Sequence, residues 1–444
     1  MKGNKIDRKK ILLKNISFGV IYKVINMGIV FTTIPLLLNY LEEEQYGIWV
    51  TIFSLVNMAL FVDGGIGNGL KTKLSKALSL KNYKLSNSYI STAYISVTIL
   101  SILILIVGFL LIFNLDLKVL FNTSLTNQEL RKVLSTTLIL VIIGFILNLH
   151  KSLYYANQEA SKVELAALIY QLIILILIAV LYQFFSKNLF YISLVYGGAN
   201  ILVSLIFTFN FFKNNKNLNL SLNYFKKDKV NDLLGLSISF FIIQLCLIVI
   251  FTSDNLIITN LIGPVEVTTY DVVYKLFQVV VTFSVILQDS LWALYSDAYE
   301  KKDYTWIRKT LKRLNKLFLG FIILTIFFYF ISKPVIGIWT QKDLNISNNL
   351  ILFMSIYILV RAYGIIYMNF LNAIGKIKLQ MILFVIGALI NIPLSFYFVK
   401  ISGLGSGGVI LGTIFSILGL SLILPIQSFK ILNKLEKNKI ILKR

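Results

Sequence analysis

Residue types that build metal centres and soluble domains are scarce in this sequence. Its 444 residues include one cysteine, Cys246, and one histidine, His150, and only 14% of the residues are charged. A single Cys excludes a disulfide framework, and one Cys with one His excludes a metal site that needs several such ligands. A soluble domain carries about 25% charged residues, so soluble, disordered and collagen-like classes are excluded as well.

The chain is instead rich in apolar residues. They make up 57% of the sequence, and the mean hydropathy is +0.80. Apolar runs of about 18–30 residues are long enough to cross a bilayer core of about 30 Å, and in lipid they must be helical. Twelve such runs cover residues 16–38, 47–69, 89–113, 133–155, 163–185, 190–212, 233–262, 272–295, 314–331, 350–371, 379–399 and 407–429. The sequence therefore predicts an all-α polytopic membrane protein with about twelve transmembrane helices.

The net charge of +23 lies in the gaps between the apolar runs and does not form a basic binding face, so we expect no nucleic-acid partner. With the N-terminus inside, 33 of the 43 Lys and Arg residues fall in cytoplasmic segments and seven in outside loops. This asymmetry follows the positive-inside rule and predicts that both termini are cytoplasmic. The first run is too long for the apolar part of a signal peptide, so we expect it to remain as a helix.

The runs fall into two sets of six around a polar, Lys- and Asn-rich segment. We expect an N-terminal six-helix lobe at residues 1–215 and a cytoplasmic linker at 216–232. A C-terminal six-helix lobe at 233–429 and a basic cytoplasmic tail at 430–444 would follow. Because each lobe has an even number of spans, the two would be parallel repeats related by an axis along the membrane normal.

Enzyme motifs are absent or lie in the wrong setting. Residues 403–408 (GLGSGG) have the spacing of a dinucleotide fingerprint, but they form an outside turn between two membrane helices. No P-loop, HExxH or GxSxG motif occurs. We expect no enzymatic activity, no catalytic residue, no metal and no cofactor. His150, near the inner end of the fourth run, is interpreted as structural or interfacial.

Charged side chains inside the apolar runs are the most informative residues. A charge near the middle of a bilayer costs about 3 kcal/mol or more, so it normally faces a polar cavity or an ionic partner. The charges in question are Lys23, Asp63, Asp254, Lys275, Asp289 and Arg361. Asp271 precedes Lys275 by four positions, so a local ion pair explains Lys275 equally well. For the others, pairing between helices is the alternative to a cavity.

Polar residues recur at helical spacing in four of the runs, and lipid would reject such stripes. Besides the charges, the stripes contain Asn26, Gln244, Asn255, Gln278, Thr282 and Tyr357. We interpret the four stripes as the lining of one water-filled cavity. Its deepest charges, Lys23 and Arg361, are cationic, so the cavity should favour an anion such as a diphosphate. The planar Arg side chain is well matched to phosphate.

Several segments resemble Wzx-type polysaccharide flippases. Residues 41–49 (LEEEQYGIW) and 61–69 (FVDGGIGNG) resemble the first helical hairpin of that family. The segments at 254–258 (DNLII) and 263–267 (GPVEV) are similar to its seventh and eighth helices. The segments 292–299 (WALYSDAY) and 372–376 (NAIGK) continue the match, which covers nearly the whole chain.

The resemblance implies the polysaccharide branch of the MATE/MOP exporter superfamily, with two six-helix lobes around a V-shaped cavity. It implies alternating-access flipping of undecaprenyl-diphosphate-linked oligosaccharides, precursors of O-antigen or capsule/exopolysaccharide, across the bacterial cytoplasmic (inner) membrane. Lys23, Lys275 and Arg361 would bind the substrate, and the three intramembrane aspartates are candidates for coupling to H⁺ or Na⁺. The expected partners are the lipid-linked substrate and the bilayer, with a polysaccharide polymerase or glycosyltransferases as further candidates.

Two rival functions remain open. A cation-coupled multidrug exporter of the MATE type would share the fold, but it should have an acidic or apolar cavity, and Lys23 and Arg361 argue against that. A membrane glycosyltransferase or polymerase would need a sizeable outside loop with catalytic acids or arginines. The longest outside loops expected here, 114–132 and 332–349, are short and have few such residues.

Overall fold

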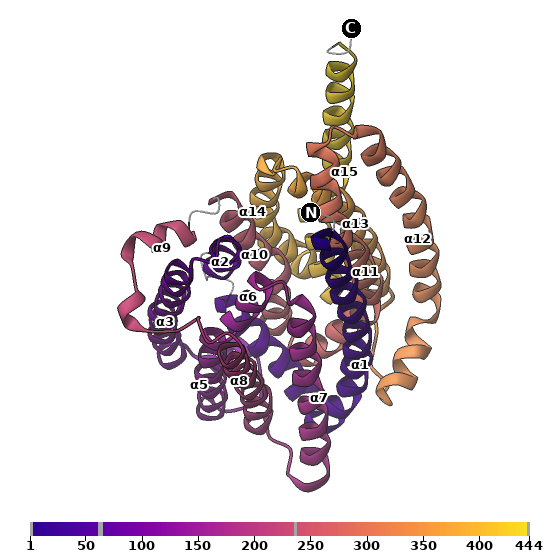
Figure 1. The fold of residues 1–444 in the computed structure, drawn as a ribbon. Coiled ribbons are helices and arrows are strands. Elements are labelled where there is room, and N and C mark those ends of the chain that lie inside the picture. The colour runs from indigo at the N-terminus through magenta and orange to yellow at the C-terminus, as the bar shows by residue number, and fades with distance from the viewer. Residues whose placement is uncertain (1–2, 61–64, 235–237, 442–444) are drawn as a thin grey trace. The chain divides into compact units, whose positions relative to one another are not determined.

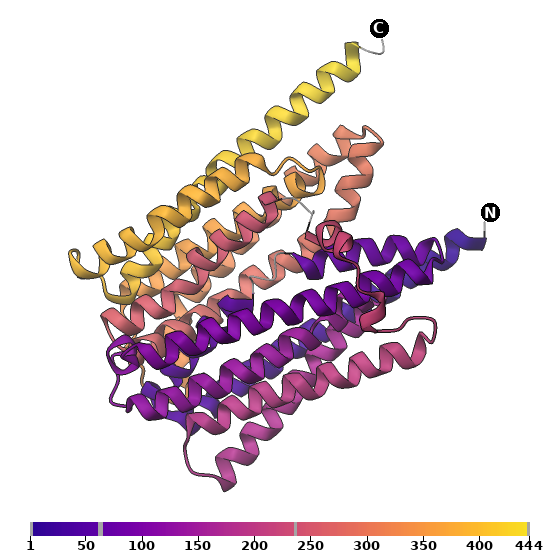
Figure 2. The same cartoon turned by 90° about the vertical axis from the view of Figure 1, so that its left-hand side faces the viewer.

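The computed structural model describes residues 3–60, 65–234 and 238–441 (Figure 1). These residues form helices joined by short connections, and no strand lies among them. The chain divides into two compact units, Met1–Phe241 and Ile242–Arg444. Within each unit the long helices run roughly parallel or antiparallel to one another (Figure 2).

The first unit contains one very long helix, five further long or medium helices and several short ones. Its elements are α1 (Gly3–Leu60), α2 (Ile66–Ser79), α3 (Tyr83–Asn114), α4 (Leu117–Phe121), α5 (Asn127–Leu147), α6 (Leu149–Ala156), α7 (Ala160–Phe184), α8 (Leu189–Asn214), the 3₁₀ turn η1 (Leu222–Tyr224) and α9 (Lys227–Leu234). Helix α1 packs along α7, and α5 packs along α8. A cluster of apolar side chains joins α2, α3 and α6, and Leu70, Ile90 and Leu153 are fully buried in it.

The second unit is built from six helices, and the first of these, α10, begins at the boundary between the units. They are α10 (Ile238–Leu261), α11 (Pro264–Glu300), α12 (Tyr304–Thr340), α13 (Asn348–Ala373), α14 (Lys378–Lys400) and α15 (Gly405–Ile441). Helix α15 packs along both α13 and α14, and α11 packs along α13. Helix α12 curves along its length (Figure 1).

Ten helices of the described part of the chain are long and apolar enough to cross a membrane. Helix α1 contains the first predicted run, 16–38, and the second, 47–69, as far as Leu60, and a kink at the non-helical Glu42 (φ 64°, ψ 177°) separates the two helical segments. The run predicted at 272–295 lies within α11, which is not among the ten. Among the described residues, helices thus lie at the predicted apolar runs, whereas the count of twelve spans and the orientation of the termini stay predictions.

Small residues allow α14 and α15 to approach each other closely. A Cβ atom on Gly387 would lie 2.3 Å from the carbonyl oxygen of Ser416, and one on Gly412 would lie 2.6 Å from Oγ of Ser395. Helices in lipid associate through such close packing, because burial of apolar surface gives no advantage there. The two glycines therefore fix the spacing of this helix pair.

Candidate functional site

Arg361 of α13 lies at the centre of an aromatic cluster in the second unit. Its Nη1 donates to the hydroxyl of Tyr274 at 2.9 Å and to the hydroxyl of Tyr357 at 2.8 Å. The guanidinium carbon lies 4.6 Å from the ring centroid of Phe251 on α10, within cation–π distance. Among the described residues, no carboxylate lies within 4 Å of Arg361. Two hydroxyls and a π face solvate its positive charge, and no carboxylate of the described part of the chain neutralises it.

The guanidinium borders a cavity of about 120 Å³. Phe251, Gly364, Phe384 and Ser421 also line it. An Arg held by neutral partners keeps N–H groups in a fixed fork, which suits bidentate recognition of phosphate or carboxylate oxygens. The site can therefore hold an anionic group beside apolar surface.

Asp254 of α10 lies close by and is 4% exposed. Its Oδ2 accepts a hydrogen bond from the hydroxyl of Tyr270 at 2.8 Å, and Thr413 of α15 donates to both carboxylate oxygens at 3.1 Å. The rings of Tyr270 and Tyr274 stack, with centroids 6.4 Å apart. Because Tyr274 accepts from Arg361, the tyrosine pair connects the buried acid to the half-buried cation, and no ion pair joins the two among the described residues.

Asn391 of α14 extends this polar network and is fully buried. Its Nδ2 donates to Thr413 Oγ1 at 3.2 Å and to Ser416 Oγ at 3.3 Å, and its Oδ1 accepts from Ser253 at 3.3 Å. Three helices, α10, α14 and α15, are joined by these contacts. The amide therefore fixes the position of Thr413, which in turn holds the Asp254 carboxylate.

The other residues predicted for the second unit lie on α10 and α11. Lys275 forms an ion pair with Asp271 at 2.7 Å, the local partner that the spacing of four indicates. Gln278 and Thr282 are half-buried one turn apart, with the Thr282 hydroxyl donating to the Gln278 carbonyl at 3.0 Å. Gln244 and Asn255 are half-buried on α10. Only the backbone of Asp289 is described, and Asp63 lies outside the described residues.

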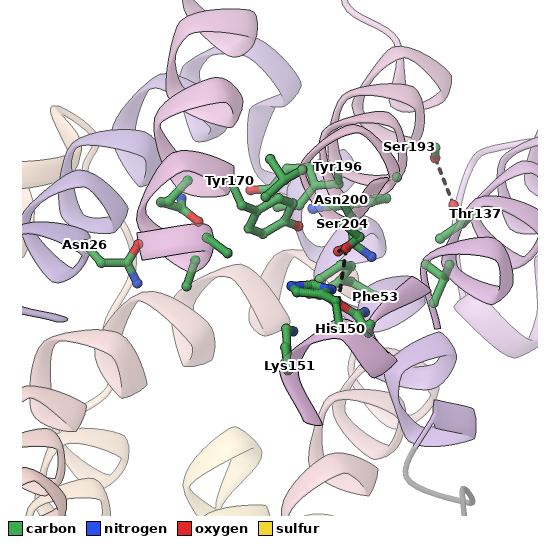
Figure 3. Close-up of a pocket in the computed structure, with 18 residues that line it drawn as sticks. Asn26, Phe53, Thr137, His150, Lys151, Tyr170, Ser193, Tyr196, Asn200 and Ser204 are labelled. Atoms are coloured by element: carbon green, nitrogen blue, oxygen red, sulfur yellow. Dashed lines mark hydrogen bonds between the residues drawn. The ribbon is translucent and has the colours of Figure 1, made fainter. Parts of the chain in front are cut away.

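Lys23 and Asn26 belong to the first unit, on α1. Lys23 Nζ lies 3.7 Å from Glu164 Oε1 of α7, an interhelical ion pair that the sequence left open as an alternative to a cavity. The structure thus balances the charge of Lys23 within its own unit, in contrast to Arg361. Asn26 lines a separate pocket of about 370 Å³ in this unit (Figure 3).

That pocket is formed by residues of α1, α5, α6, α7 and α8 and the junction between α5 and α6. Tyr170, Tyr196, Asn200, His150 and Lys151 are among its lining residues (Figure 3). His150 is 1% exposed and hydrogen-bonds the Leu147 carbonyl through Nδ1 at 2.9 Å. The sequence interpretation treated His150 as structural or interfacial, and no local pattern of residues indicated that it lines a pocket.

The structure adds residues that the sequence reasoning missed. Tyr274, Tyr270, Thr413 and Phe251 surround the charges of Asp254 and Arg361. Tyr270 and Tyr274 are four positions apart, which places them on one helix face. Aromatic residues at this spacing more often serve to pack helices together than to form a functional site. No group of three or more metal-ligating side chains occurs among the described residues.

Comparison with known proteins places the chain in a family context. Residues 12–291 match the family model for polysaccharide biosynthesis protein, and residues 240–397 match the MatE model. A Salmonella typhimurium protein described as a candidate O-antigen transporter is 26% identical over 410 residues, covering 89% of this chain and 90% of the relative. A Yersinia pseudotuberculosis protein described as a candidate O-antigen export protein is 23% identical, with 80% and 82% coverage.

The fold is also that of known transporters. The structure resembles an inward-facing multidrug resistance MATE family transporter of the MOP superfamily with a TM-score of 0.76, covering 94% of this chain and 96% of the other. The two sequences are only 14% identical, so the likeness concerns the fold alone. It confirms the all-α, MATE-like membrane fold predicted from the sequence.

Proposed function

Because the chain belongs to the polysaccharide biosynthesis protein family and has a MATE-like fold, we propose that it is a transporter of lipid-linked oligosaccharides. In this proposal it moves undecaprenyl-diphosphate-linked repeat units of O-antigen, capsule or exopolysaccharide across the bacterial cytoplasmic membrane. The two relatives described as O-antigen transport or export proteins support this substrate class. The chain performs no covalent chemistry on its substrate.

The observation that carries the proposal is the charge of Arg361, which no carboxylate of the described residues compensates. Its guanidinium borders a cavity and is held by two tyrosine hydroxyls and a phenylalanine ring, with no described carboxylate within ion-pair distance. Two oxygens of a phosphate group in the diphosphate can accept two parallel N–H hydrogen bonds from one guanidinium. A cationic drug would be repelled by the same group. The surrounding apolar surface favours a substrate whose charge is attached to a lipid.

We assign substrate binding to Arg361 first and to Lys23 and Lys275 second. Each lysine has a carboxylate partner, Glu164 and Asp271 respectively, so each contributes less net positive charge. To bind either lysine, the diphosphate would have to displace the carboxylate by making stronger contacts with the ammonium group. This ranking predicts that removal of the Arg361 charge has the largest effect on transport.

Asp254 is the described acid best suited to ion coupling, with Asp63 and Asp289 as the other candidates from the sequence. It is buried, accepts from two hydroxyl donors, and has no Lys or Arg within 4 Å among the described residues. Binding of H⁺ or Na⁺ there would change the charge of a site connected to Arg361 through stacked tyrosines. Such an ion shifts the balance between inward-open and outward-open states only if it binds one state more tightly.

The test uses a strain deleted for the gene and complemented with variants. Surface polysaccharide and the lipid-linked oligosaccharide pool are measured together. We expect deletion to remove surface glycan while precursor accumulates on the cytoplasmic side. Arg361→Gln should lower export about tenfold or more, since charge-assisted hydrogen bonds contribute about 1.5–3 kcal/mol each.

Arg131→Gln is the matched control. Arg131 also lies near a phenylalanine ring, that of Phe113, but its donors bind the backbone carbonyls of Ile112 and Phe113 and it lines no pocket described here. It should export normally at equal membrane abundance. Normal export by the Lys23→Ala/Arg361→Ala double variant would contradict the cationic site. Normal glycan with raised sensitivity to cationic drugs in the deletion strain would favour the multidrug exporter.

A further inference from the structure

The pocket of the first unit is lined mainly by aromatic rings and neutral polar groups, which are not the groups that bind a diphosphate. Its lining includes the rings of Tyr170 and Tyr196 and the amides of Asn26 and Asn200 (Figure 3). Lys151 is its only charged residue among the described lining residues, and none of them is acidic. A mixture of aromatic rings and amides in a mostly neutral pocket suits a ligand with both C–H faces and hydroxyl groups.

His150 restricts what the ligand must offer. Its Nδ1 lies 2.9 Å from the Leu147 carbonyl oxygen, which can only accept, so Nδ1 carries the proton. In the neutral ring Nε2 then has a lone pair and can only accept a hydrogen bond. That atom is buried and has no hydrogen-bond partner among the described residues. His150, a lining residue of the pocket, therefore carries an acceptor that has no donor among the described residues.

Asn26 presents a second unused acceptor. Its Oδ1 is buried and likewise has no partner among the described residues. Two acceptors with no donor among the described residues suit a ligand that supplies O–H or N–H groups. A fully ionised phosphate has only acceptors, and a quaternary ammonium ion has neither donors nor acceptors. A hydroxylated ring satisfies both side chains.

The aromatic residues are positioned to receive such a ring. Trp49 is 3% exposed and packs against Tyr196 with ring centroids 5.0 Å apart, and Phe53 lies 5.5 Å from the same tyrosine. These contacts fix the orientation of Tyr196, which is half-buried, as is Tyr170. The volume of about 370 Å³ lies in the range of about 300–1,000 Å³ typical of small-molecule sites.

From these observations we infer that this pocket is a sugar subsite, which binds one pyranose ring of the transported oligosaccharide. The inference rests on the proposed function and adds a specificity site to it. His150 Nε2 and Asn26 Oδ1 accept from sugar hydroxyls or an N-acetyl N–H group, and the rings of Tyr170 and Tyr196 both pack against the C–H faces of the sugar. The sugar, and not the diphosphate, is recognised here.

The test measures binding by the full chain in lipid nanodiscs. Dissociation constants are compared for undecaprenyl diphosphate and for the same lipid carrying one N-acetylhexosamine. We expect the wild type to bind the sugar-bearing lipid about tenfold more tightly. His150→Phe keeps an aromatic ring but removes the acceptor, and Tyr170→Leu removes a ring. Each should reduce this preference to about threefold or less, and neither should change the affinity for the sugar-free lipid.

Two further variants make the result specific. His150→Gln keeps an acceptor near the Nε2 position and should retain part of the preference. Ser101→Ala removes an equally buried, unpartnered oxygen of α3 that does not line the pocket, and it should bind both lipids as the wild type does. If His150→Phe fails to fold, Tyr170→Leu decides the question, because Tyr170 is only half-buried.

The outcomes separate this inference from the proposed function. Equal affinity of the wild type for both lipids would overturn the sugar subsite, and the unused acceptors would then be assigned to bound water. A sugar preference that survives in both pocket variants would place the sugar elsewhere and also overturn it. Failure of the wild type to bind either lipid would refute the proposed function itself. Arg361→Gln should weaken binding of both lipids equally.

Discussion

The buried amide of Asn391 offers the sharpest test of the polar network in the second unit. It makes three hydrogen bonds, with Ser253, Thr413 and Ser416, and it is fully buried. Replacement by Leu keeps the size of the side chain and removes all three bonds. The difference in unfolding free energy between Asn391→Leu and the wild type therefore reports the net strength of these bonds.

The structure sets the expected magnitude. Hydrogen bonds between membrane helices average about 0.6 kcal/mol, so three of them amount to about 2 kcal/mol. No cost is added for buried hydroxyls left without a hydrogen bond, because each one keeps an acceptor. These acceptors are Val249 O for Ser253, Asp254 for Thr413 and Gly412 O for Ser416. Asn391→Ala also leaves a void in the core and should cost about 1–2 kcal/mol more.

The assay is unfolding of the purified protein in mixed micelles by increasing SDS, followed by fluorescence. A double-mutant cycle of Asn391→Leu with Thr413→Val isolates their shared bond, and we expect a coupling energy of about 0.6 kcal/mol. An Asn391→Leu protein within about 0.3 kcal/mol of the wild type would refute the reasoning. Strict additivity of the cycle would show that the 3.2 Å contact contributes nothing.

Three further predictions concern packing and surface charge. Gly387→Val would place atoms about 2.3 Å from a backbone oxygen of α15, so we expect loss of the monodisperse peak in size-exclusion chromatography. Arg308→Ala removes a partly exposed ion pair with Glu436 at 2.8 Å, and the melting temperature should fall by the equivalent of about 1 kcal/mol or less. A hydrogen bond from Lys229 lowers the pKa of the Asp232 carboxyl, so this contact stabilises the fold above the ordinary Asp pKa of about 4 and is lost as the pH falls through the lowered value. Asp232→Asn should therefore melt with a weaker dependence on pH below about 4, and an unchanged dependence would contradict that assignment.

The helical architecture was readable from the sequence because a bilayer leaves few alternatives. A run such as 163–185 has no water to satisfy its backbone and must be helical, and the structure places α7 at Ala160–Phe184. The sequence also separates the runs 16–38 and 47–69, and the structure has a kink between two helical segments of α1 there, at the non-helical Glu42.

The candidate site was only partly predictable. Arg361 and Tyr357 share a helix face at a spacing of four, and the structure joins them at 2.8 Å. Tyr274 comes from another helix, 87 positions earlier, and no periodicity links it to Arg361. The partner of Lys23 is likewise a residue of a distant helix, Glu164. Local spacing identifies which side chains share a face, but it does not identify which faces meet.

The sequence by itself determined the membrane class, the positions of the apolar helices and the presence of costly charges within them, because lipid penalises each unsuitable residue wherever it lies in the fold. Only the tertiary structure decided which partner each polar atom contacts. It paired Lys23 with Glu164, placed Arg361 among tyrosines, and left Nε2 of His150 without a hydrogen-bond partner among the described residues. Hydrogen bonds and ion pairs require contact within about 3–4 Å, and only the packing of helices brings such atoms together.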